Sequence, residues 1–274
     1  MKNHSFVATG TRLAFLGFLL WGKWLAASEV EWNPEVREVG VFLCHATFSW
    51  DMAKEQLQIL ANLQRDIQQK LGLGDPREKV EVFLFSSQET WARYHRQYLP
   101  DTPFRRAMFR KPDVILKTKS SRGKIYAYLS PQLEQDLRHE GTHAILHATL
   151  GKPLPIWIDE GLAEYFEVSL PPWQNPTWLE QTRSRLQKHQ TIPLKKLEKI
   201  TGMRDMTREA YGDSWAWVVF LLDGPQPIRH ILPDYLRDVS KKLFYPSLSS
   251  RITKVSKTPH ETLLQRYFLR EMPD

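Results

Sequence analysis

The stretch of residues 130–167, SPQLEQDLRHEGTHAILHATLGKPLPIWIDEGLAEYFE, decides how the rest of the chain is organised. It holds two segments rich in histidine and acidic residues, separated by a short proline-containing turn. The first segment carries His139 and His143 four residues apart, with Glu140 between them. On a helix, this H-E-x-x-H spacing puts both imidazoles on one face, about 6 Å apart along the axis. Two rings in this arrangement can bind one metal ion.

Local signals predict that the first segment is a helix. Ser130 is a good N-cap, and Pro131 suits the first helical position, where its missing N–H is not needed. About twenty residues later, Gly151 supplies a left-handed stop. Gly141 lies inside this helix, where glycine costs about 1 kcal/mol relative to alanine. Close approach of a substrate or a neighbouring backbone beside Glu140 would explain it.

A catalytic zinc ion usually takes three protein ligands and keeps a fourth position for water, so a third ligand has to come from elsewhere. The second segment offers Glu160 and Glu164, one helical turn apart. We expect Glu160 to be the ligand and Glu164 to accept a hydrogen bond that fixes a ligand histidine's tautomer. His147 continues the four-residue series but lies about 12 Å from His139 on a straight helix, too far to share an ion with it. We therefore expect His147 to be structural.

The motifs HEGTH and WIDEGLAEYFE together resemble the gluzincin metallopeptidases, in which H-E-x-x-H is followed by a glutamate ligand on the next helix. Residues 157–163 are similar to the W-x-x-E-G-F-A run of aminopeptidase N-like members, with Leu162 in the phenylalanine position. Glu164 takes the place of the acid that follows the ligand by four residues in thermolysin-like members. Small bacterial metallopeptidase domains share the short spacing between the motifs. The resemblance is strong over residues 130–167 and extends more weakly to Tyr211.

This resemblance implies a zincin-like α+β fold, one Zn²⁺ ion and hydrolysis of peptide bonds in a peptide or protein substrate. His139, His143 and Glu160 would bind the ion, and Glu140 would be the general base that takes a proton from the attacking water. Glu164 would orient His139. A zinc-binding scaffold or sensor domain without catalysis, and a membrane-anchored interaction protein, are the alternatives.

Two further site features follow from the same resemblance. Tyr211 lies where aminopeptidase N-like enzymes carry a tyrosine that stabilises the tetrahedral oxyanion, although an ordinary core tyrosine is the alternative. A strand just before the metal-binding helix corresponds to the edge strand that pairs with an extended substrate, or is a plain sheet strand. Its residues are Ile125, Tyr126, Ala127 and Tyr128. A G-x-M-E-N run, which helps capture a free amine in aminopeptidase N-like enzymes, is missing there, which favours an endopeptidase.

The first 28 residues have the layout of a signal peptide. Lys2 and Arg12 precede an apolar run over residues 13–22, and small residues follow before position 29. This run is shorter than the roughly 20 residues of a membrane-spanning helix. We expect cleavage and export to the periplasm or the medium, with an uncleaved membrane anchor as the alternative.

Composition narrows the class of protein further. The formal net charge of +7 includes Lys2, Arg12 and Lys23 of the signal-like segment, which leaves +4 for the remainder. This modest charge, without a nucleic-acid-binding module, argues against nucleic acid as a partner but allows association with an anionic cell envelope. Cys44 is the only cysteine, so no intrachain disulfide can form.

Periodicity predicts an α+β lobe over residues 29–150 that ends in the H-E-x-x-H helix, and a helical lobe over residues 151–274. The first lobe is expected to contain a mixed sheet with helices. Its predicted strands span 38–48, 79–85, 114–119 and 125–129, and its predicted helices span 51–71 and 87–98. Periodicity alone does not assign the apolar run 215–222, although the resemblance favours a buried helix.

Overall fold

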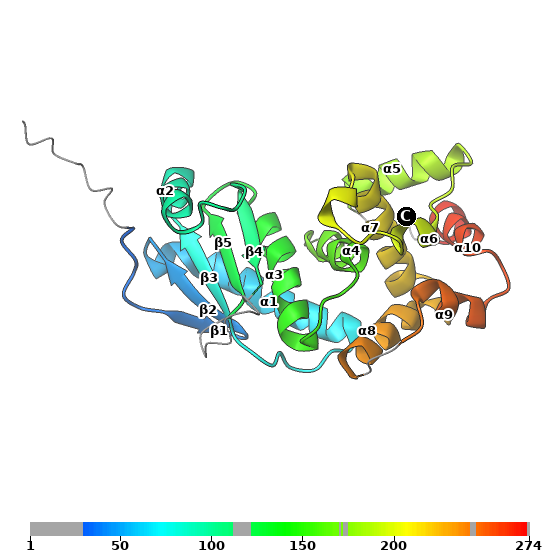
Figure 1. Ribbon diagram of the computed structural model, residues 1–274, viewed down its shortest axis with the longest axis horizontal. Coiled ribbons are helices and arrows are strands. Elements are labelled where there is room, and N and C mark those ends of the chain that lie inside the picture. Colours follow the sequence, from blue (N-terminus) through cyan, green and yellow to red (C-terminus); the bar gives the residue numbers. More distant parts are fainter. Residues whose placement is uncertain (1–29, 112–121, 170, 172–174, 242–244, 273–274) are drawn as a thin grey trace, which may run out of the picture.

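The computed structural model describes residues 30–111, 122–169, 171, 175–241 and 245–272. A five-stranded sheet with its own helices forms one side of the molecule, and a group of helices forms the other (Figure 1). The predicted α+β class is therefore confirmed. The signal-like segment at 1–28 and the predicted strand at 114–119 lie outside the described residues. Among the described helices, none is both long enough and apolar enough to cross a membrane.

The sheet has a parallel centre and antiparallel outer strands. Its members are β1 (Arg37–Val39), β2 (Phe42–Ala46), β3 (Val80–Phe85), β4 (Ala107–Arg110) and β5 (Lys124–Tyr128). They lie in the order β1-β2-β3-β5-β4, and β2, β3 and β5 run parallel. Both outer strands are antiparallel to their neighbours. A parallel centre of this kind has to be covered on both faces.

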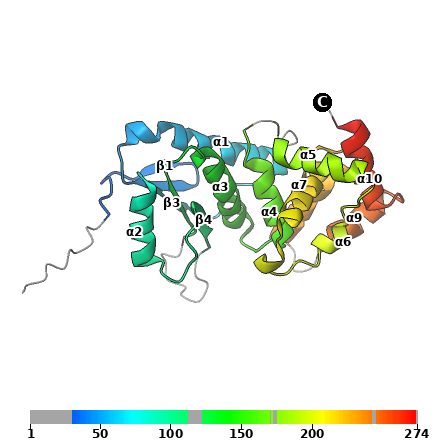
Figure 2. The ribbon, with the colours of Figure 1, turned by 90° about the horizontal axis from the view of Figure 1, so that it is seen from above.

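Helices provide this cover. They are α1 (Lys54–Leu71), which follows a 3-10 turn at Trp50–Ala53, α2 (Gln88–Tyr98) and α3 (Leu133–Leu150). In β3, Val82 and Leu84 join the core beneath α1 and α3, whereas Phe83 and Phe85 join an aromatic cluster beneath α2. This alternation follows the period of two of a strand, and Figure 2 shows α2 on the opposite side of the sheet from α1. The sheet is thus the middle layer of three.

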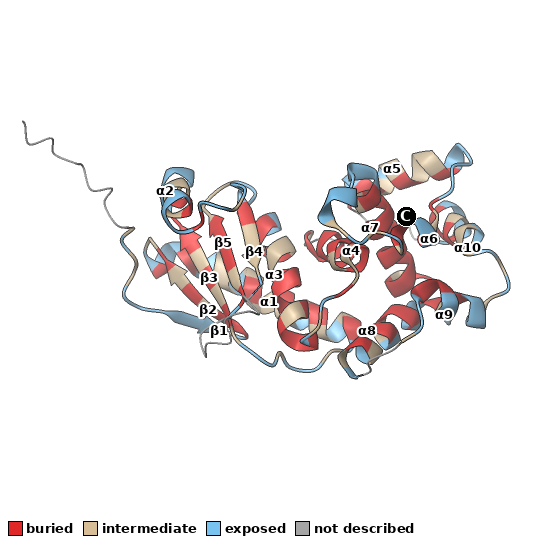
Figure 3. Cartoon of the chain, viewed as in Figure 1, coloured by how far each residue is buried: buried red, intermediate tan, exposed pale blue. Residues whose placement is uncertain are grey.

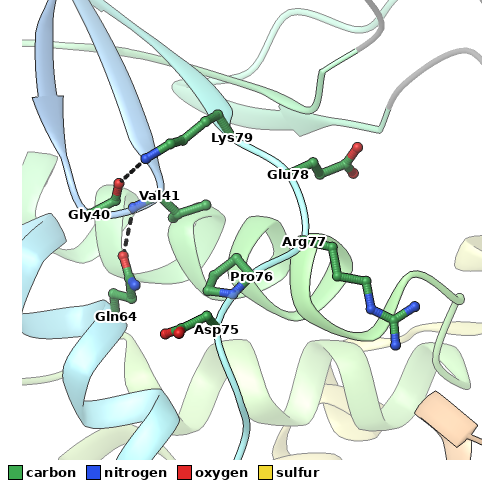
Figure 4. Close-up of a pocket in the computed structure, with 8 residues that line it drawn as sticks. All are labelled: Gly40, Val41, Gln64, Asp75, Pro76, Arg77, Glu78 and Lys79. Atoms are coloured by element: carbon green, nitrogen blue, oxygen red, sulfur yellow. Dashed lines mark hydrogen bonds between the residues drawn. The ribbon is translucent and has the colours of Figure 1, made fainter.

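The strand predicted over residues 38–48 is instead a hairpin of β1 and β2. The chain turns at Gly40, whose φ of 57° lies in the left-handed region that favours glycine. Gln64 of α1 accepts a hydrogen bond from the Val41 N–H (2.7 Å), and Lys79 donates one to the Gly40 carbonyl (2.8 Å). Figure 4 shows these bonds at the wall of a cavity of about 330 Å³. Polar side chains at this cavity therefore hold the hairpin against α1.

The strand before α3 lies inside the sheet and not at its edge. β5 pairs with β3 on one side and with β4 on the other. Its residues Ile125, Tyr126 and Ala127 are at most 3% exposed. The prediction that Ile125, Tyr126, Ala127 and Tyr128 bind an extended substrate is therefore wrong, because the backbone of this strand already pairs on both sides. The outer strand next to α3 is β4, which we did not predict.

The helix with the H-E-x-x-H motif, α3, starts at Leu133, slightly later than predicted. Ser130 accepts a backbone hydrogen bond in the turn that precedes it (3.3 Å). The end is as predicted, because Gly151 caps the helix with a φ of 65°. A Cβ at Gly141 would come within 2.7 Å of Leu63 Cδ2 on α1. Packing between α1 and α3 thus explains this glycine, rather than a bound substrate.

The chain after α3 is helical. Its α-helices are α4 (Ile156–Phe166), α5 (Pro176–Gln187), α6 (Leu194–Leu197), α7 (Arg208–Asp223), α8 (Ile231–Lys241), α9 (Leu248–Val255) and α10 (His260–Arg266); shorter turns are Met203–Asp205, Ile228–His230 and Tyr267–Glu271. The apolar run 215–222 is part of α7 and is buried (Figure 3). α7 packs on α4 so closely that a Cβ at Gly161 would lie 2.8 Å from the Ser214 carbonyl oxygen.

A half-buried polar contact joins the two sides of the molecule. Asp223, at the end of α7, pairs with Lys70 of α1. The same carboxylate accepts a hydrogen bond from the Tyr165 hydroxyl of α4 (2.8 Å). Helices from the sheet side and the helical side therefore share one anchor, and the apolar core is also continuous between them.

Candidate metal centre

Two adjacent helices bring the predicted ligands together. His139 and His143 lie on α3, and Glu160 lies on α4, which packs beside it (Figure 1). The Nε2 atoms of both histidines face the same oxygen, Glu160 Oε2, each at 3.7 Å. All three donor atoms lie within 4.8 Å of one another. The sequence-predicted ligand group is therefore assembled in space.

This spacing suits one zinc ion. With metal–donor bonds of about 2.1 Å, the corners of a tetrahedron lie about 3.4 Å apart. The two distances of 3.7 Å between the histidines and Glu160 are close to this value. Two imidazoles and one carboxylate form a donor set that zinc uses in catalytic sites, where water takes the fourth position. Within the described parts of the chain, no fourth histidine, cysteine or acid belongs to this group.

Each ligand histidine has a carboxylate beside its other ring nitrogen. Glu167 Oε2 lies 3.3 Å from His139 Nδ1, and Asp159 Oδ1 lies 3.2 Å from His143 Nδ1. The second pair is not aligned for a hydrogen bond, so its attraction is electrostatic. A carboxylate at Nδ1 favours the proton on that nitrogen and leaves Nε2 free for a metal. Neither Asp159 nor Glu167 was identified from the sequence.

Glu164 was expected to lie at the ring nitrogen of His139, but Glu167 lies there instead. Glu164 lies close to His139, but its carboxylate accepts a hydrogen bond from Trp178 Nε1 (2.6 Å). Burial and the neighbouring Glu167 raise the pKa of Glu164 to about 7. Both acids follow Glu160 at helical spacings, four and seven residues on, so spacing alone did not separate them. Glu164 thus bonds to Trp178, and Glu167 is the acid that lies at His139 Nδ1.

Carboxylates dominate the electrostatics of the site. Burial lowers the pKa of His139, but the carboxylates of Glu160 and Glu167 beside it outweigh burial and hold the pKa well above 6.5. Burial also lowers the pKa of His143, but the neighbouring acids, chiefly Asp159, outweigh burial and raise the pKa overall. The opposite holds for Asp159, whose pKa is lowered despite burial because His143 is beside it. Because the pKa values of both histidines are raised, a metal ion has to displace protons from them up to a higher pH than from ordinary imidazoles.

We expect zinc to stabilise the protein more strongly as the pH rises from about 6 to about 8. The raised histidine pKa values stabilise the metal-free fold below the ordinary pKa of 6.5, and this contribution is lost as the pH rises through the raised values. Zinc binding, which releases those protons, becomes more favourable over the same range. Thermal unfolding with and without zinc across this range measures the effect. A zinc-induced rise in Tm that is independent of pH would contradict it.

Glu167→Gln is expected to weaken zinc binding roughly 10- to 100-fold, because glutamine loses the charge that orients His139. The matched control is Glu164→Gln, since Glu164 already has a pKa of about 7 and bonds to Trp178 instead. Competition with a fluorescent zinc chelator gives both affinities. A larger loss in Glu164→Gln than in Glu167→Gln would return the orienting role to Glu164.

Glu140 lies between the ligands and the edge of the sheet. Its Oε2 accepts a hydrogen bond from the Phe109 N–H of β4 (2.7 Å). The ligands and Glu140 share one cavity of about 500 Å³. Its lining consists of Thr102, Pro103, Arg105, Met108, Phe109, Lys111, His139, Glu140, His143, Leu154, Ile156, Asp159, Glu160, Met203 and Tyr211. A half-buried carboxylate next to the three ligands is placed to act as a base.

Tyr211 of α7 lines the same cavity. Burial, with help from Glu160 and Glu164, raises its pKa to about 12. The hydroxyl is therefore protonated at neutral pH and can donate a hydrogen bond. Its role at the oxyanion stays a prediction, but the fold brings Tyr211 and Glu140 to one cavity.

His147 lies outside the ligand group, as expected. Its Nδ1 faces Glu78 at 3.5 Å, and its ring lies near that of Phe109. Burial lowers the pKa of His147. The residue is thus a neighbour of the site on the same helix without being part of it.

Comparisons with known proteins add little. No protein-family model matches the chain, and no curated protein matches it. One matching solved structure is that of a mutant M1 zinc metallopeptidase from Deinococcus radiodurans, with 15% identity and a TM-score of 0.36. The match covers 89% of this chain and 53% of the other, so the chain spans about half the length of that protein. The assignment of the metal centre therefore depends on the geometry of these side chains.

Proposed function

We propose that this protein is a zinc-dependent peptidase of the gluzincin type. The observation that carries the proposal is the convergence of three donor atoms, from His139, His143 and Glu160, beside Glu140 in one cavity. A purely structural zinc site is usually closed by four protein ligands. Three ligands next to a carboxylate base and a cavity fit hydrolysis better than a scaffold or a sensor.

The residues around this centre would divide the chemistry between them. When bound, a zinc ion would polarise a water molecule and the carbonyl of the scissile peptide bond. Glu140 would accept the proton of the attacking water and pass it to the leaving amine. The Tyr211 hydroxyl would donate a hydrogen bond to the carbonyl oxygen as it gains negative charge. Asp159 and Glu167 would hold the ligand imidazoles in the correct tautomer.

The strand β4 is our candidate for holding the peptide. It is the outer strand of the sheet on the side of α3, and Met108 and Phe109 line the cavity. The Phe109 N–H reaches Glu140 and is not used within the sheet. Backbone groups on an outer strand can pair with an extended peptide without requiring a particular side chain. β4 would thus take the role that we first gave to β5.

An endopeptidase is favoured over an aminopeptidase. An aminopeptidase needs an acidic group that binds the free amine of its substrate. Among the described residues that line the cavity, the carboxylates are Glu140, Asp159 and Glu160. Each already contacts a backbone N–H, a histidine or both histidines.

The test is cleavage of an unbiased peptide library by the purified protein, read by mass spectrometry with and without a chelator. Internal cleavage that the chelator abolishes and zinc restores is the expected result. Release of N-terminal residues alone would favour an aminopeptidase. Stoichiometric zinc without cleavage would favour a scaffold or sensor.

We also propose that the protein is exported, on the basis of the signal-like layout of residues 1–28. N-terminal sequencing of the protein from the cell envelope tests this. A mature chain that starts near residue 29 supports cleavage, whereas a membrane-bound chain that retains Met1 supports an anchor.

A further inference from the structure

Arg105 reaches the cavity from a segment whose position is fixed on both sides. Its own carbonyl accepts a hydrogen bond from Nε1 of the fully buried Trp91 (2.8 Å). The next residue, Arg106, makes a bidentate pair with Asp136 of α3 (2.6 and 2.7 Å). Asp136 precedes Glu140 by one helical turn. These bonds therefore fix the position of the backbone at Arg105 relative to the helix that carries the candidate ligands.

The guanidinium of Arg105 is uncommitted. In the described part of the chain it has neither an ion pair nor a side-chain hydrogen bond, whereas the adjacent Arg106 has both. The side chain is exposed yet lines the cavity. Its charge also acts on the Tyr211 hydroxyl, where it opposes the rise in pKa that burial causes. Arg105 thus faces the same space as the proposed oxyanion donor.

Arg105 is the one cation of the described cavity lining without a partner. Lys111, the other cation, lies 3.7 Å from Asp159. The carboxylates in the cavity are engaged as described above, and most of the remaining lining is apolar: Pro103, Met108, Phe109, Leu154, Ile156 and Met203. A ligand that fills this cavity would therefore meet apolar walls, the metal centre and one free positive charge.

We propose that Arg105 binds a carboxylate of the substrate and is a specificity-determining residue. The proposal rests on the peptidase function above and names its substrate class as peptides with an acidic group close to the scissile bond. Arginine suits this role because its planar guanidinium can donate two parallel hydrogen bonds to a carboxylate. The carboxylate can come from an Asp or Glu side chain or from the C-terminus of the peptide, since both have the same chemistry.

The test compares kcat/KM for pairs of blocked peptides that differ only by Glu or Gln at one position, scanned across the cleavage site. A second pair differs only in a C-terminal acid or amide. For at least one pair, we expect the zinc-loaded protein to prefer the carboxylate about tenfold. The preference is expected to vanish in Arg105→Gln, to persist in part in Arg105→Lys and to decline with added salt. The pair that responds identifies the source of the carboxylate.

Arg96→Gln is the matched control, because Arg96 is an exposed arginine of α2 that does not line the cavity. Its carboxylate preference should equal that of the unchanged protein. Equal cleavage of both members of every pair, or a preference that survives Arg105→Gln, overturns the role of Arg105 while the peptidase function stands. If no peptide is cleaved, the peptidase function fails. Calorimetric titration of the same peptides into the zinc-loaded protein and Arg105→Gln then tests the carboxylate contact by affinity alone, and equal affinities overturn it.

Discussion

Glu140→Gln is expected to lower turnover by on the order of 10³-fold while zinc stays bound. Glutamine has nearly the same shape, and its carbonyl oxygen can still accept the hydrogen bond from the Phe109 N–H. The amide cannot take up a proton at neutral pH, so the proposed base is lost without the ligands being disturbed. Steady-state cleavage of a library-derived peptide and zinc analysis of the same sample measure both quantities.

Full activity in Glu140→Gln would remove Glu140 from the mechanism. Loss of zinc together with activity would instead mean that Glu140 supports the metal centre. Thermal unfolding is the control for folding, since the variant should unfold within a few degrees of the unchanged protein. A loss of activity with zinc content and Tm retained is the combination that identifies a base.

His143→Ala is expected to abolish both zinc binding and cleavage. The substitution removes one of three donors and leaves Glu160 Oε2 facing a single imidazole. Two protein donors hold zinc weakly, because a catalytic site usually needs three protein ligands. Elemental analysis after desalting should fall from about one zinc ion per chain to near zero.

His147→Ala is the matched control, because His147 lies one turn further along α3 and faces Glu78. This variant should retain zinc and most of its activity. If His147→Ala loses the metal and His143→Ala retains it, the ligand assignment is wrong. Because both substitutions remove an imidazole from the same helix, a difference between them cannot come from helix propensity.

The convergence of the candidate metal ligands could be predicted from the sequence because it depends on local geometry. The spacing of His139 and His143 fixes their relative position once the segment is a helix, and Glu160 follows after a short turn. Gly151 marked the end of α3 for the same local reason. The side chains at the Nδ1 atoms were harder to assign, because they depend on how α4 is rotated against α3. Trp178, which donates a hydrogen bond to Glu164, comes from a helix with no fixed sequence relation to the motif.

The sheet shows where prediction from sequence failed. β5 was recognised as a strand from its apolar residues, but strand order depends on pairing between distant segments. β4 is short, and its residues Met108 and Phe109 are only half-buried, so it carried no clear strand pattern. Position at the edge of a sheet is a property of the assembled sheet. This is why β5 was expected at the edge of the sheet, although it lies inside it.

The tight contact between α4 and α7 has a consequence for the chemistry. Gly161 follows the ligand Glu160 directly, and Ser214 lies three residues after Tyr211, so the point of closest approach sits next to both functional groups. Any side chain larger than hydrogen at Gly161 would push the two helices apart. The distance between the candidate third ligand and the proposed oxyanion donor therefore depends on the absence of a single methyl group at Gly161.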